Sequence, residues 1–345
     1  MPSRAIGLGM HQDGDQMLDA QSVFNIVVTG RVFWHLRFFV CSLVHNSDAR
    51  FRFVANGCAP ETLTLMEDYA AAHPGRVVEI IDVSPDAMAA HGVALDAVRR
   101  SRNDGELFCF VDTDIKARAP FLHGYFDLLG SHSAVTSGKQ VWVDDHVVPD
   151  THLGLGLDGR HFFHPNGFVY GCPHFAMYRR AHLDETCARW DVGLGSAGPD
   201  LSDEARGQLA AIGHLYKIYD TGKIVNILLQ VDGRSLCHVD PDELIHIGGM
   251  SHFLSPPDPG AAGGEVETPA WAAFHGMEPR LAVTRYTAAL LRGLVEHTTL
   301  PDLPPRLDPA MQERLLFVRD EIIDLVERYR TCAAEPVGAG DKWRN

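Results

Sequence analysis

Apolar runs of strand length alternate with stretches of helical period from about residue 22 to residue 111, and this alternation most constrains the fold. Helical periodicity fills residues 32–45 and 60–73, and a third helix is expected to open at Ser84-Pro85-Asp86, with Ser84 as its N-cap, and to run to about Arg102. The apolar runs are VFNIVV (23–28), RFRFVAN (50–56), RVVEIID (76–82) and LFCFV (107–111). This order predicts right-handed βαβ crossovers and therefore a doubly wound, mostly parallel α/β sheet.

The rest of the chain has a different texture. Short apolar runs, glycines, histidines and aromatic residues dominate 115–252, which predicts a mixed extension of the sheet with long loops. Residues 199–212 predict a helix capped by Ser202, and 279–297 and 308–330 predict two C-terminal helices. We expect one α/β domain over 22–254 and a C-terminal helical region over 270–331, packed on the domain or used for self-association. Residues 1–21 are expected to be a flexible lead, 255–269 a loop or linker, and 332–345 a disordered tail.

The charge balance limits the partners. With 30 Lys plus Arg against 45 Asp plus Glu, the formal net charge of -15 argues against nucleic acid or an anionic membrane as the main partner. The seven cysteines are scattered and form no CxxC pair, so neither a disulfide framework nor a zinc ribbon is predicted. The first residues lack the apolar core of a signal peptide, and no apolar run is long enough to span a bilayer. We therefore expect a soluble, cytoplasmic protein.

Two aspartates follow directly on the fourth apolar run. Asp112 and Asp114, with Thr113 between them, stand where a buried strand would surface at the carboxyl edge of the sheet, the edge at which ligands of such sheets bind. Carboxylates at this spacing can converge on one hard cation once the chain turns, and Mg²⁺ or Mn²⁺ needs few protein ligands when substrate phosphates complete its shell. Such an ion would neutralise the charge that builds on a departing diphosphate.

Strand–helix alternation that leads to an apolar strand and an Asp-x-Asp resembles the metal-dependent glycosyltransferases of the GT-A fold over roughly residues 22–254. The resemblance implies a nucleotide-binding half (22–114) and an acceptor half (115–254). It also implies that Asp114 binds the metal directly and that Asp112 contacts the ribose or reaches the metal through water. The stretch DELIHIGGMSHF (242–253) resembles the late histidine segment of the family, which makes His246 the first choice and His252 the second as a further metal ligand. An incidental histidine is the alternative, since the chain has 19.

The same resemblance suggests residues that hold the nucleotide. The loops after the first three strands are expected to meet the base and ribose, and the segment before the fourth strand is expected to meet phosphate or ribose. The residues assigned in this way are Thr29, Gly30, Arg31, Asn56, Asp82, Arg102, Asp112 and Thr113, with Arg99 and Asn103 as weaker candidates. Several of them can equally be surface residues without a role, and Arg99 fits a solvated helix face.

The acceptor side has two candidate segments. FFHPNGFVYGCPHFAMYRR (162–180) resembles the segment that lines the sugar pocket, with Gly167 and Gly171 for close approach and Phe168, Tyr170 and Phe175 for stacking or for the core. Its histidines and His161 lack the cysteine pattern of a zinc cluster. Asp203 and Glu204, with Asp200 as a competitor, resemble the acidic pair that serves as catalytic base in many inverting members. The alternative is that these acids only stabilise a helix N-terminus.

The resemblance implies transfer of a hexosyl group from a nucleoside-diphosphate sugar, with UDP favoured, to a hydroxyl of a small molecule or glycan, with Mn²⁺ or Mg²⁺ as cofactor. Two alternatives stay open. A haloacid-dehalogenase-like phosphatase also places Asp-x-Asp after an apolar strand, but its motif wants Thr or Val where this chain has Lys116 and lies on the first strand. A non-catalytic nucleotide-sugar-binding protein could keep the same fold. A nucleotidyltransferase or an NAD-binding module is disfavoured because the glycine-rich loop that each requires is missing.

Overall fold

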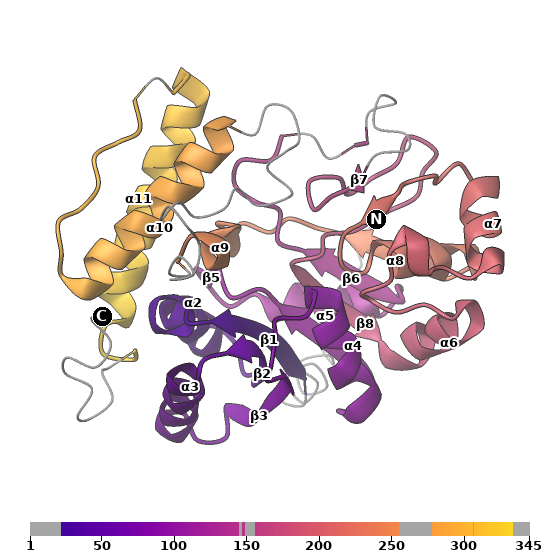
Figure 1. Cartoon of the computed structure of the whole chain (residues 1–345), viewed down its shortest axis with the longest axis horizontal. Helices are drawn as coiled ribbons and strands as arrows, with labels where there is room; N and C mark the ends of the chain where they lie inside the picture. Colours follow the sequence, from indigo (N-terminus) through magenta and orange to yellow (C-terminus); the bar gives the residue numbers. More distant parts are fainter. Residues whose placement is uncertain (1–21, 145–146, 149–155, 255–277, 306, 334–345) are drawn as a thin grey trace, which may run out of the picture.

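The computed structural model describes residues 22–144, 147–148, 156–254, 278–305 and 307–333. The expected flexible lead, the expected linker and nearly all of the expected tail lie outside the described residues. Figure 1 shows an α/β body at the centre and a pair of C-terminal helices, α10 and α11, lying against one side of it. No helix among the described residues combines the length and the apolar character needed to cross a membrane.

A seven-stranded mixed sheet forms the centre of the fold. Its order is β10 (Leu236–His238), β6 (Ala134–Ser137), β8 (Phe175–Arg179), β4 (Leu107–Val111), β1 (Val23–Gly30), β2 (Arg50–Cys58) and β3 (Val77–Ser84). Strand β8 pairs antiparallel with both β4 and β6, whereas the other pairs are parallel. The carboxyl ends of β1 to β4 therefore meet at one edge, as the sequence predicts.

Helices cover both faces of the sheet because side chains alternate along each strand. In β1, Phe24, Ile26 and Val28 belong to one buried cluster and Val27 to the other. The first cluster takes in α2 (Phe33–His45), α3 (Pro60–Ala72) and α5 (Leu122–Leu129), whereas the second takes in α4 (His91–Ser101), α6 (Arg180–Trp190), α7 (Asp203–Ala211) and α8 (Lys223–Val231). This layering confirms the predicted fold class, a doubly wound mixed α/β sheet.

The third helix begins later than predicted. Strand β3 runs through Ser84, so Ser84 is not an N-cap, and α4 starts only at His91. The side chain of Asn56 explains the delay: its amide accepts from the backbone N–H of Ala89 (2.8 Å) and donates to the carbonyl of the same residue (2.9 Å). These two bonds hold the segment before α4 extended across the end of β2.

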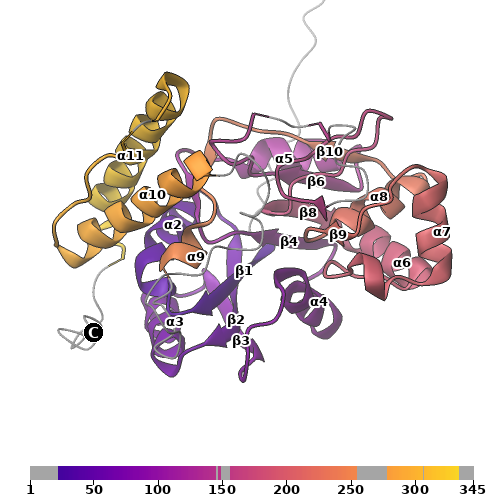
Figure 2. The same cartoon turned by 45° about the horizontal axis from the view of Figure 1, so that its top comes forward.

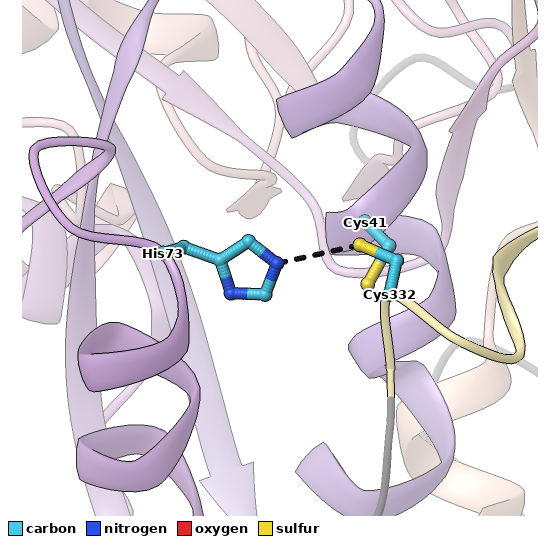
Figure 3. A group of neighbouring side chains, drawn as sticks. All are labelled: Cys41, His73 and Cys332. Carbon is cyan, nitrogen blue, oxygen red and sulfur yellow. Dashed lines mark hydrogen bonds between the residues drawn. The ribbon is translucent and has the colours of Figure 1, made fainter.

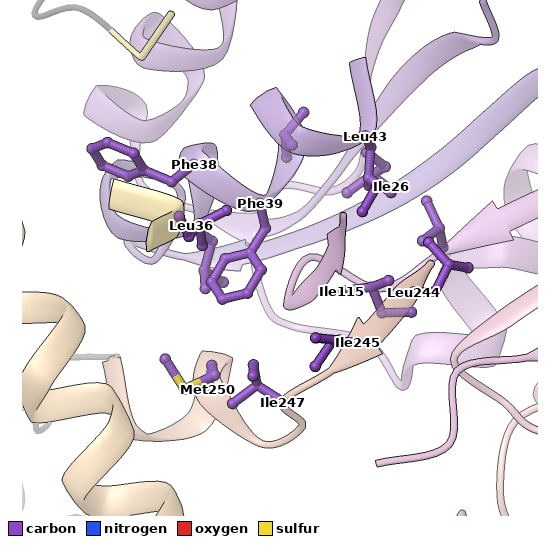
Figure 4. Close-up of a cluster of buried hydrophobic side chains, with 14 of the residues drawn as sticks. Ile26, Leu36, Phe38, Phe39, Leu43, Ile115, Leu244, Ile245, Ile247 and Met250 are labelled. Carbon is purple, nitrogen blue, oxygen red and sulfur yellow. The ribbon is translucent and has the colours of Figure 1, made fainter. Parts of the chain in front are cut away.

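A second, two-stranded sheet continues the fourth strand. After Asp112 to Asp114 the chain enters β5 (Ile115–Ala117), which pairs antiparallel with β11 (Leu244–His246). In the chain, β11 is followed by α9 (Met250–Leu254). Figure 4 shows Ile115, Ile245 and Met250 facing Phe39 and Leu36 of α2. Apolar burial therefore fixes the strand pair against the main body. Short strands β7 (Gly156–Leu157) and β9 (Ile218–Tyr219) form a third sheet, and η2 (Gly198–Asp200) precedes α7.

The predicted C-terminal helices are present as α10 (Glu278–Glu296) and α11 (Pro309–Tyr329). One face of α11 is apolar and buried in the first core cluster together with α2, and Leu316 beside it is half-buried. Lys116 of β5 is buried and reaches α11, where its Nζ donates to Glu321 Oε2 (2.6 Å) and Asp324 Oδ2 (2.7 Å). The helices are thus packed on the α/β body, and self-association stays a prediction.

Candidate metal centre

The turn from β4 to β5 carries the two aspartates at the carboxyl edge of the sheet. The Asp112 N–H donates to the His174 carbonyl (2.8 Å), which extends the antiparallel β4–β8 pairing by one residue beyond the pair Val111 and Phe175. On the other side of the turn, Ile115 pairs with His246 in β11. Two sheets therefore bring His174 and His246 to the same turn.

Asp114 and His246 form a buried pair, with 5% and 1% of their side chains exposed. Oδ1 of Asp114 lies 3.1 Å from Nε2 of His246, and Oδ2 accepts from the backbone N–H of Met250 (3.0 Å). Gly248 and Gly249 both have positive φ between His246 and Met250, so the glycine turn is what aims this N–H at the carboxylate. The pairing of His246 with Asp114 is the arrangement that the sequence suggests.

Asp112 is the more exposed aspartate, at 23% of its side chain, and lies within 4.0 Å of three imidazoles. Its Oδ2 lies 2.8 Å from Nδ1 of His174 and 4.0 Å from Nε2 of His246, and its Oδ1 lies 3.5 Å from Nε2 of His91 at the start of α4. Ligand atoms of Asp112, His174 and His246 all lie within 4.8 Å of one another. This group is the centre of the candidate site, and Asp114 borders it through His246.

The hydrogen bond from Nδ1 of His246 leaves its Nε2 to face the carboxylates of Asp114 and Asp112. Its Nδ1 donates to the carbonyl of Gly138 (2.6 Å), so in neutral imidazole the lone pair of Nε2 faces oxygens of Asp114 and Asp112. Lone pairs of a nitrogen and of carboxylates repel unless a proton or a metal ion stands between them. Carboxylates are the ligands that suit Mn²⁺ or Mg²⁺, so the two aspartates fit the expected ion.

The pKa values describe the same competition for a positive charge. Burial raises the pKa of Asp112 to about 6, an effect that His91 and His246 reduce. For His246, burial alone would lower the pKa, but the charge of Asp114 and its hydrogen bond outweigh it and raise the pKa. For His174, burial and the neighbouring His246 hold the pKa well below its usual value. The group thus contains one imidazole that takes up a proton readily and one that stays neutral.

A second wall of the site contains a carboxylate for which the sequence gives no motif. A side-chain Cβ at Gly159 would lie 2.8 Å from Nε2 of His174 and 3.1 Å from Oδ2 of Asp220, so these two groups border the same small space. Burial raises the pKa of Asp220. Asp220 precedes α8, in which the buried Lys223 donates from Nζ to the carbonyls of His161 (2.6 Å) and Gly171.

Sequence reasoning discounted His174, which the structure places beside Asp112. It was considered only with His161 and His164, as a zinc cluster, and neither of these belongs to the group around Asp112. The position of His174 follows from the antiparallel pairing of β8 with β4, which carries no local sequence signature. His91 was missed for a related reason, because the helix that it opens was expected to begin earlier.

The predicted nucleotide residues of the first three strands lie along the expected edge. Thr29 and Gly30 end β1 and are half-buried, and Asp82 near the end of β3 is exposed. Arg31 is exposed and pairs with Glu61 of α3 (2.9 Å). Asn56 is buried, and its side-chain amide makes both of its hydrogen bonds with the backbone of Ala89. It therefore supports the carboxyl edge of the sheet instead of pointing toward a ligand there.

Arg102 is the exception, and its position contradicts a phosphate contact at this site. Residues 99–103 precede β4 and therefore lie toward the amino end of that strand, whereas Asp112 follows its carboxyl end. The guanidinium of Arg102 pairs with Glu79 of β3, with Nε 2.9 Å from Oε2. Arg99 pairs with Asp96 and Asp184. The prediction failed because closeness in sequence to the motif was taken as closeness in space.

The predicted catalytic acids lie away from this centre. Asp203 and Glu204 are exposed in the first turn of α7, where Ser202 accepts from the N–H of Ala205, and Asp200 is exposed in η2. Figures 1 and 2 both place α7 at the outer edge of the molecule beside α6 and α8. Within the described part of the chain, no hydrogen bond or ion pair joins these acids to Asp112 or His174. The geometry favours the alternative in which they stabilise a helix N-terminus.

The remaining predicted residues fall into two groups. Thr113 is buried, and its hydroxyl lies 3.2 Å from that of Ser251 in α9, which also carries the half-buried His252. Among the described residues, His252 does not belong to the group formed by Asp112, His174 and His246. Tyr170 and Phe175 are fully buried, so they belong to the core rather than to a stacking surface. A Cβ at Gly171 would lie 2.7 Å from Thr136 Oγ1, which shows that this glycine serves packing.

Comparison with known proteins gives similar structures but no family. No family model matches the chain, and no curated protein does. TarS of S. aureus (residues 1–349) overlaps with a TM-score of 0.42 at 11% identity, over 90% of this chain and 83% of that chain. The mannosyltransferase PcManGT of Pyrobaculum calidifontis, solved with GDP-Man and Mn²⁺, overlaps with a TM-score of 0.36 at 14% identity, over 92% and 77%. The galactosyltransferase LgtC gives 0.38 at 14% identity, over 90% and 100%. Overlaps of this quality do not assign an activity to this chain.

Proposed function

We propose that this chain is a metal-dependent glycosyltransferase that moves a hexosyl group from a nucleoside-diphosphate sugar, with UDP favoured, to a hydroxyl of a small molecule or glycan. The observation that carries the proposal is the convergence of Asp112, His174 and His246, bordered by Asp114, at the carboxyl edge of a doubly wound sheet. The GT-A resemblance of the sequence supplies the reaction class.

Asp112, His174 and His246, with Asp114 beside His246, would hold Mn²⁺ or Mg²⁺, which when bound stabilises the negative charge of a leaving diphosphate. Asp112 is the more exposed of the two aspartates, so a phosphate that completes the shell of the ion would approach beside it. Asp114 is oriented by the Met250 N–H, and Gly138 orients His246, so both ligands are fixed before any substrate arrives. Such preorganisation reduces the reorganisation needed in the transition state.

Asp220 is the carboxylate that we propose for the acceptor side. It borders the same small space as His174, and its pKa is raised by burial, which moves a carboxylate toward the range useful for a general base at neutral pH. Asp203, Glu204 and Asp200, proposed from the sequence, have exposed side chains at the edge of the molecule.

The primary test measures manganese binding and sugar-nucleotide turnover together. Wild-type protein should bind Mn²⁺ in calorimetry and should hydrolyse or transfer from a UDP-, GDP- or dTDP-sugar. Asp114→Asn should lose both by at least about 100-fold, since it removes one charge of the ion site while keeping the side-chain shape. Asp203→Asn serves as the matched control, because the same chemical change falls on an exposed helix turn. Manganese binding without turnover would favour a nucleotide-sugar-binding protein.

The phosphatase alternative has a distinct outcome. Release of inorganic phosphate from a sugar phosphate, with no turnover of sugar nucleotides, would establish it in place of the transferase. The structure gives it little support, because Lys116 points to Glu321 and Asp324 of α11 rather than to Asp112, and β4 is the fourth strand along the chain.

A separate experiment tests Asp220. Asp220→Asn should lower kcat for transfer by 100-fold or more, while Mn²⁺ affinity stays within about twofold because Asp220 is not part of the clustered ligand group. Unchanged transfer in Asp220→Asn, with loss in Asp203→Asn or Glu204→Gln, would restore the acids predicted from the sequence.

A further inference from the structure

Two thiols and an imidazole form a second cluster, remote in sequence from the Asp112 turn. Figure 3 shows Cys41 of α2, His73 at the C-terminus of α3 and Cys332 just after α11 pointing toward one another. The sulfur atoms and an imidazole nitrogen all lie within 4.8 Å of one another. One ligand atom therefore comes from within α2, one from the residue that ends α3 and one from the segment after α11.

The imidazole is oriented as in metal sites. Nδ1 of His73 lies 2.8 Å from the carbonyl of Tyr69 and donates to it, so the lone pair of Nε2 points at Cys332 Sγ, 3.3 Å away. The ring also stacks on the Tyr69 ring, with 4.1 Å between centroids. A backbone carbonyl that holds one ring nitrogen and frees the other is the usual support of a metal-binding histidine.

Each thiol is also held by contacts with residues outside the cluster. Cys41 is fully buried in α2, and the Tyr69 hydroxyl lies 3.4 Å from its sulfur. Cys332 is positioned by the bond from Arg37 Nε to the carbonyl of Ala333 (3.0 Å).

We propose that Cys41, His73 and Cys332 form a binding site for a thiophilic divalent cation, with Zn²⁺ the expected ion. Two sulfurs at about 2.3 Å and one nitrogen at about 2.0–2.1 Å from zinc would stand roughly 3.3–4 Å apart, in keeping with the cluster. Water would take the fourth position. The bound ion would tie the end of α11 to α2 and α3. It differs in ligand softness from the carboxylate site at Asp112, which suits harder ions.

Cobalt(II) is the probe, because thiolate ligands give it a charge-transfer absorption that carboxylates and imidazoles alone do not. The metal-free full chain should bind Co²⁺ with this absorption at one equivalent, and Zn²⁺ should displace it and raise the melting temperature. Cys332→Ser should lose the absorption and the zinc-dependent shift, and His73→Gln should weaken both. Cys237→Ser, a partly buried cysteine of β10, is the matched control and should behave as wild type. Asp114→Asn should keep the thiolate absorption, which separates this site from the proposed catalytic one.

Three outcomes would overturn the proposal. One is the absence of thiolate absorption in the reduced wild-type protein. Another is absorption that persists in both Cys332→Ser and His73→Gln. The third is a Cys41–Cys332 disulfide, detected by mass spectrometry, in purified protein that binds no cobalt even after the disulfide has been reduced. If Cys332→Ser fails to fold, His73→Gln with unchanged circular dichroism carries the test.

Discussion

At the scale of single residues, His246 shows how a hydrogen bond sets the chemistry of the site. Because the carbonyl of Gly138 accepts the hydrogen bond of Nδ1, only Nε2 can interact with the two carboxylates. It can do so with a proton or with a metal ion between them. Asp112 has a similar choice, since burial raises its pKa to about 6. Protons and metal ions therefore compete for the same atoms.

This competition predicts a pH-dependent affinity for manganese. Because the ion binds the neutral form of His246, whose pKa is raised, and the carboxylate form of Asp112, whose pKa is about 6, affinity should decrease as the pH falls through neutrality and decrease further below pH 6. The fall should reach at least about tenfold per pH unit. Calorimetric titration with Mn²⁺ at several pH values measures it.

The raised pKa of Asp112 also determines how the stability of the metal-free protein changes with pH. A raised pKa means that the folded state binds a proton more tightly than the unfolded state. The Asp112 contribution to the free energy of unfolding should therefore decrease as the pH rises from about 4 to about 6. Asp112→Asn removes this contribution and serves as the control. For the binding prediction, an affinity for manganese that stays the same from pH 7 to pH 5 would contradict the assignment of Asp112 as a metal ligand.

At the scale of elements, the start of α4 is fixed by tight packing on the loop before η2. A Cβ on Gly92 would lie 2.4 Å from the carbonyl oxygen of Leu194 and 2.7 Å from the Cα of Gly195, and both are backbone atoms that cannot turn aside. This packing holds His91, the neighbour of Gly92, within 3.5 Å of Asp112. A glycine that looks like a helix breaker in the sequence is thus a spacer for the site.

A pair of glycine-to-alanine substitutions should have opposite signs. Alanine normally stabilises a helix by about 1 kcal/mol relative to glycine, and Gly207→Ala in α7 should show this, since nothing lies within 4 Å of its added Cβ. Gly92→Ala should instead destabilise by about 1–3 kcal/mol because of overpacking against Leu194. Urea denaturation measures both changes. Equal stabilisation by the two substitutions would show that the loop before η2 yields freely.

At the scale of the whole molecule, the C-terminal helices complete the core of the α/β body. Six side chains of α11 are buried in the cluster that also contains α2 and the first face of the sheet: Leu315, Val318, Ile322, Leu325, Val326 and Tyr329. At about 1.5–3 kcal/mol each, their burial is worth roughly 9–18 kcal/mol as an upper limit, similar to the whole stability of a typical domain.

Removal of these helices should therefore abolish cooperative folding. A chain that ends at residue 254 should show no sharp thermal transition and should bind a hydrophobic dye, because α2 loses its cover. A chain that ends at residue 333 keeps every described helix and should melt as the full chain does. Calorimetry and dye fluorescence distinguish the two chains. A sharp transition in the shorter chain, at the temperature of the full chain, would mean that residues 22–254 fold as an independent domain.

The sequence by itself determined the sheet and the place of the aspartates. Strand and helix periodicity are local properties, so the strands of the first 111 residues and helices α2, α3, α10 and α11 are confirmed within a few residues. The position of Asp112 and Asp114 follows as well, since ligands meet the carboxyl ends of parallel strands. The late segment with His246 also reaches this turn, as the motif suggests.

Tertiary structure decided which other residues join them. His174 reaches Asp112 through antiparallel pairing of β8 with β4, and Asp220 arrives from the start of α8, neither of which a local pattern specifies. Arg102 was placed wrongly because it precedes β4, whereas the site lies after the carboxyl end of that strand. Side-chain periodicity records which face of an element is buried, whereas the pairing of distant strands depends on packing across the whole core.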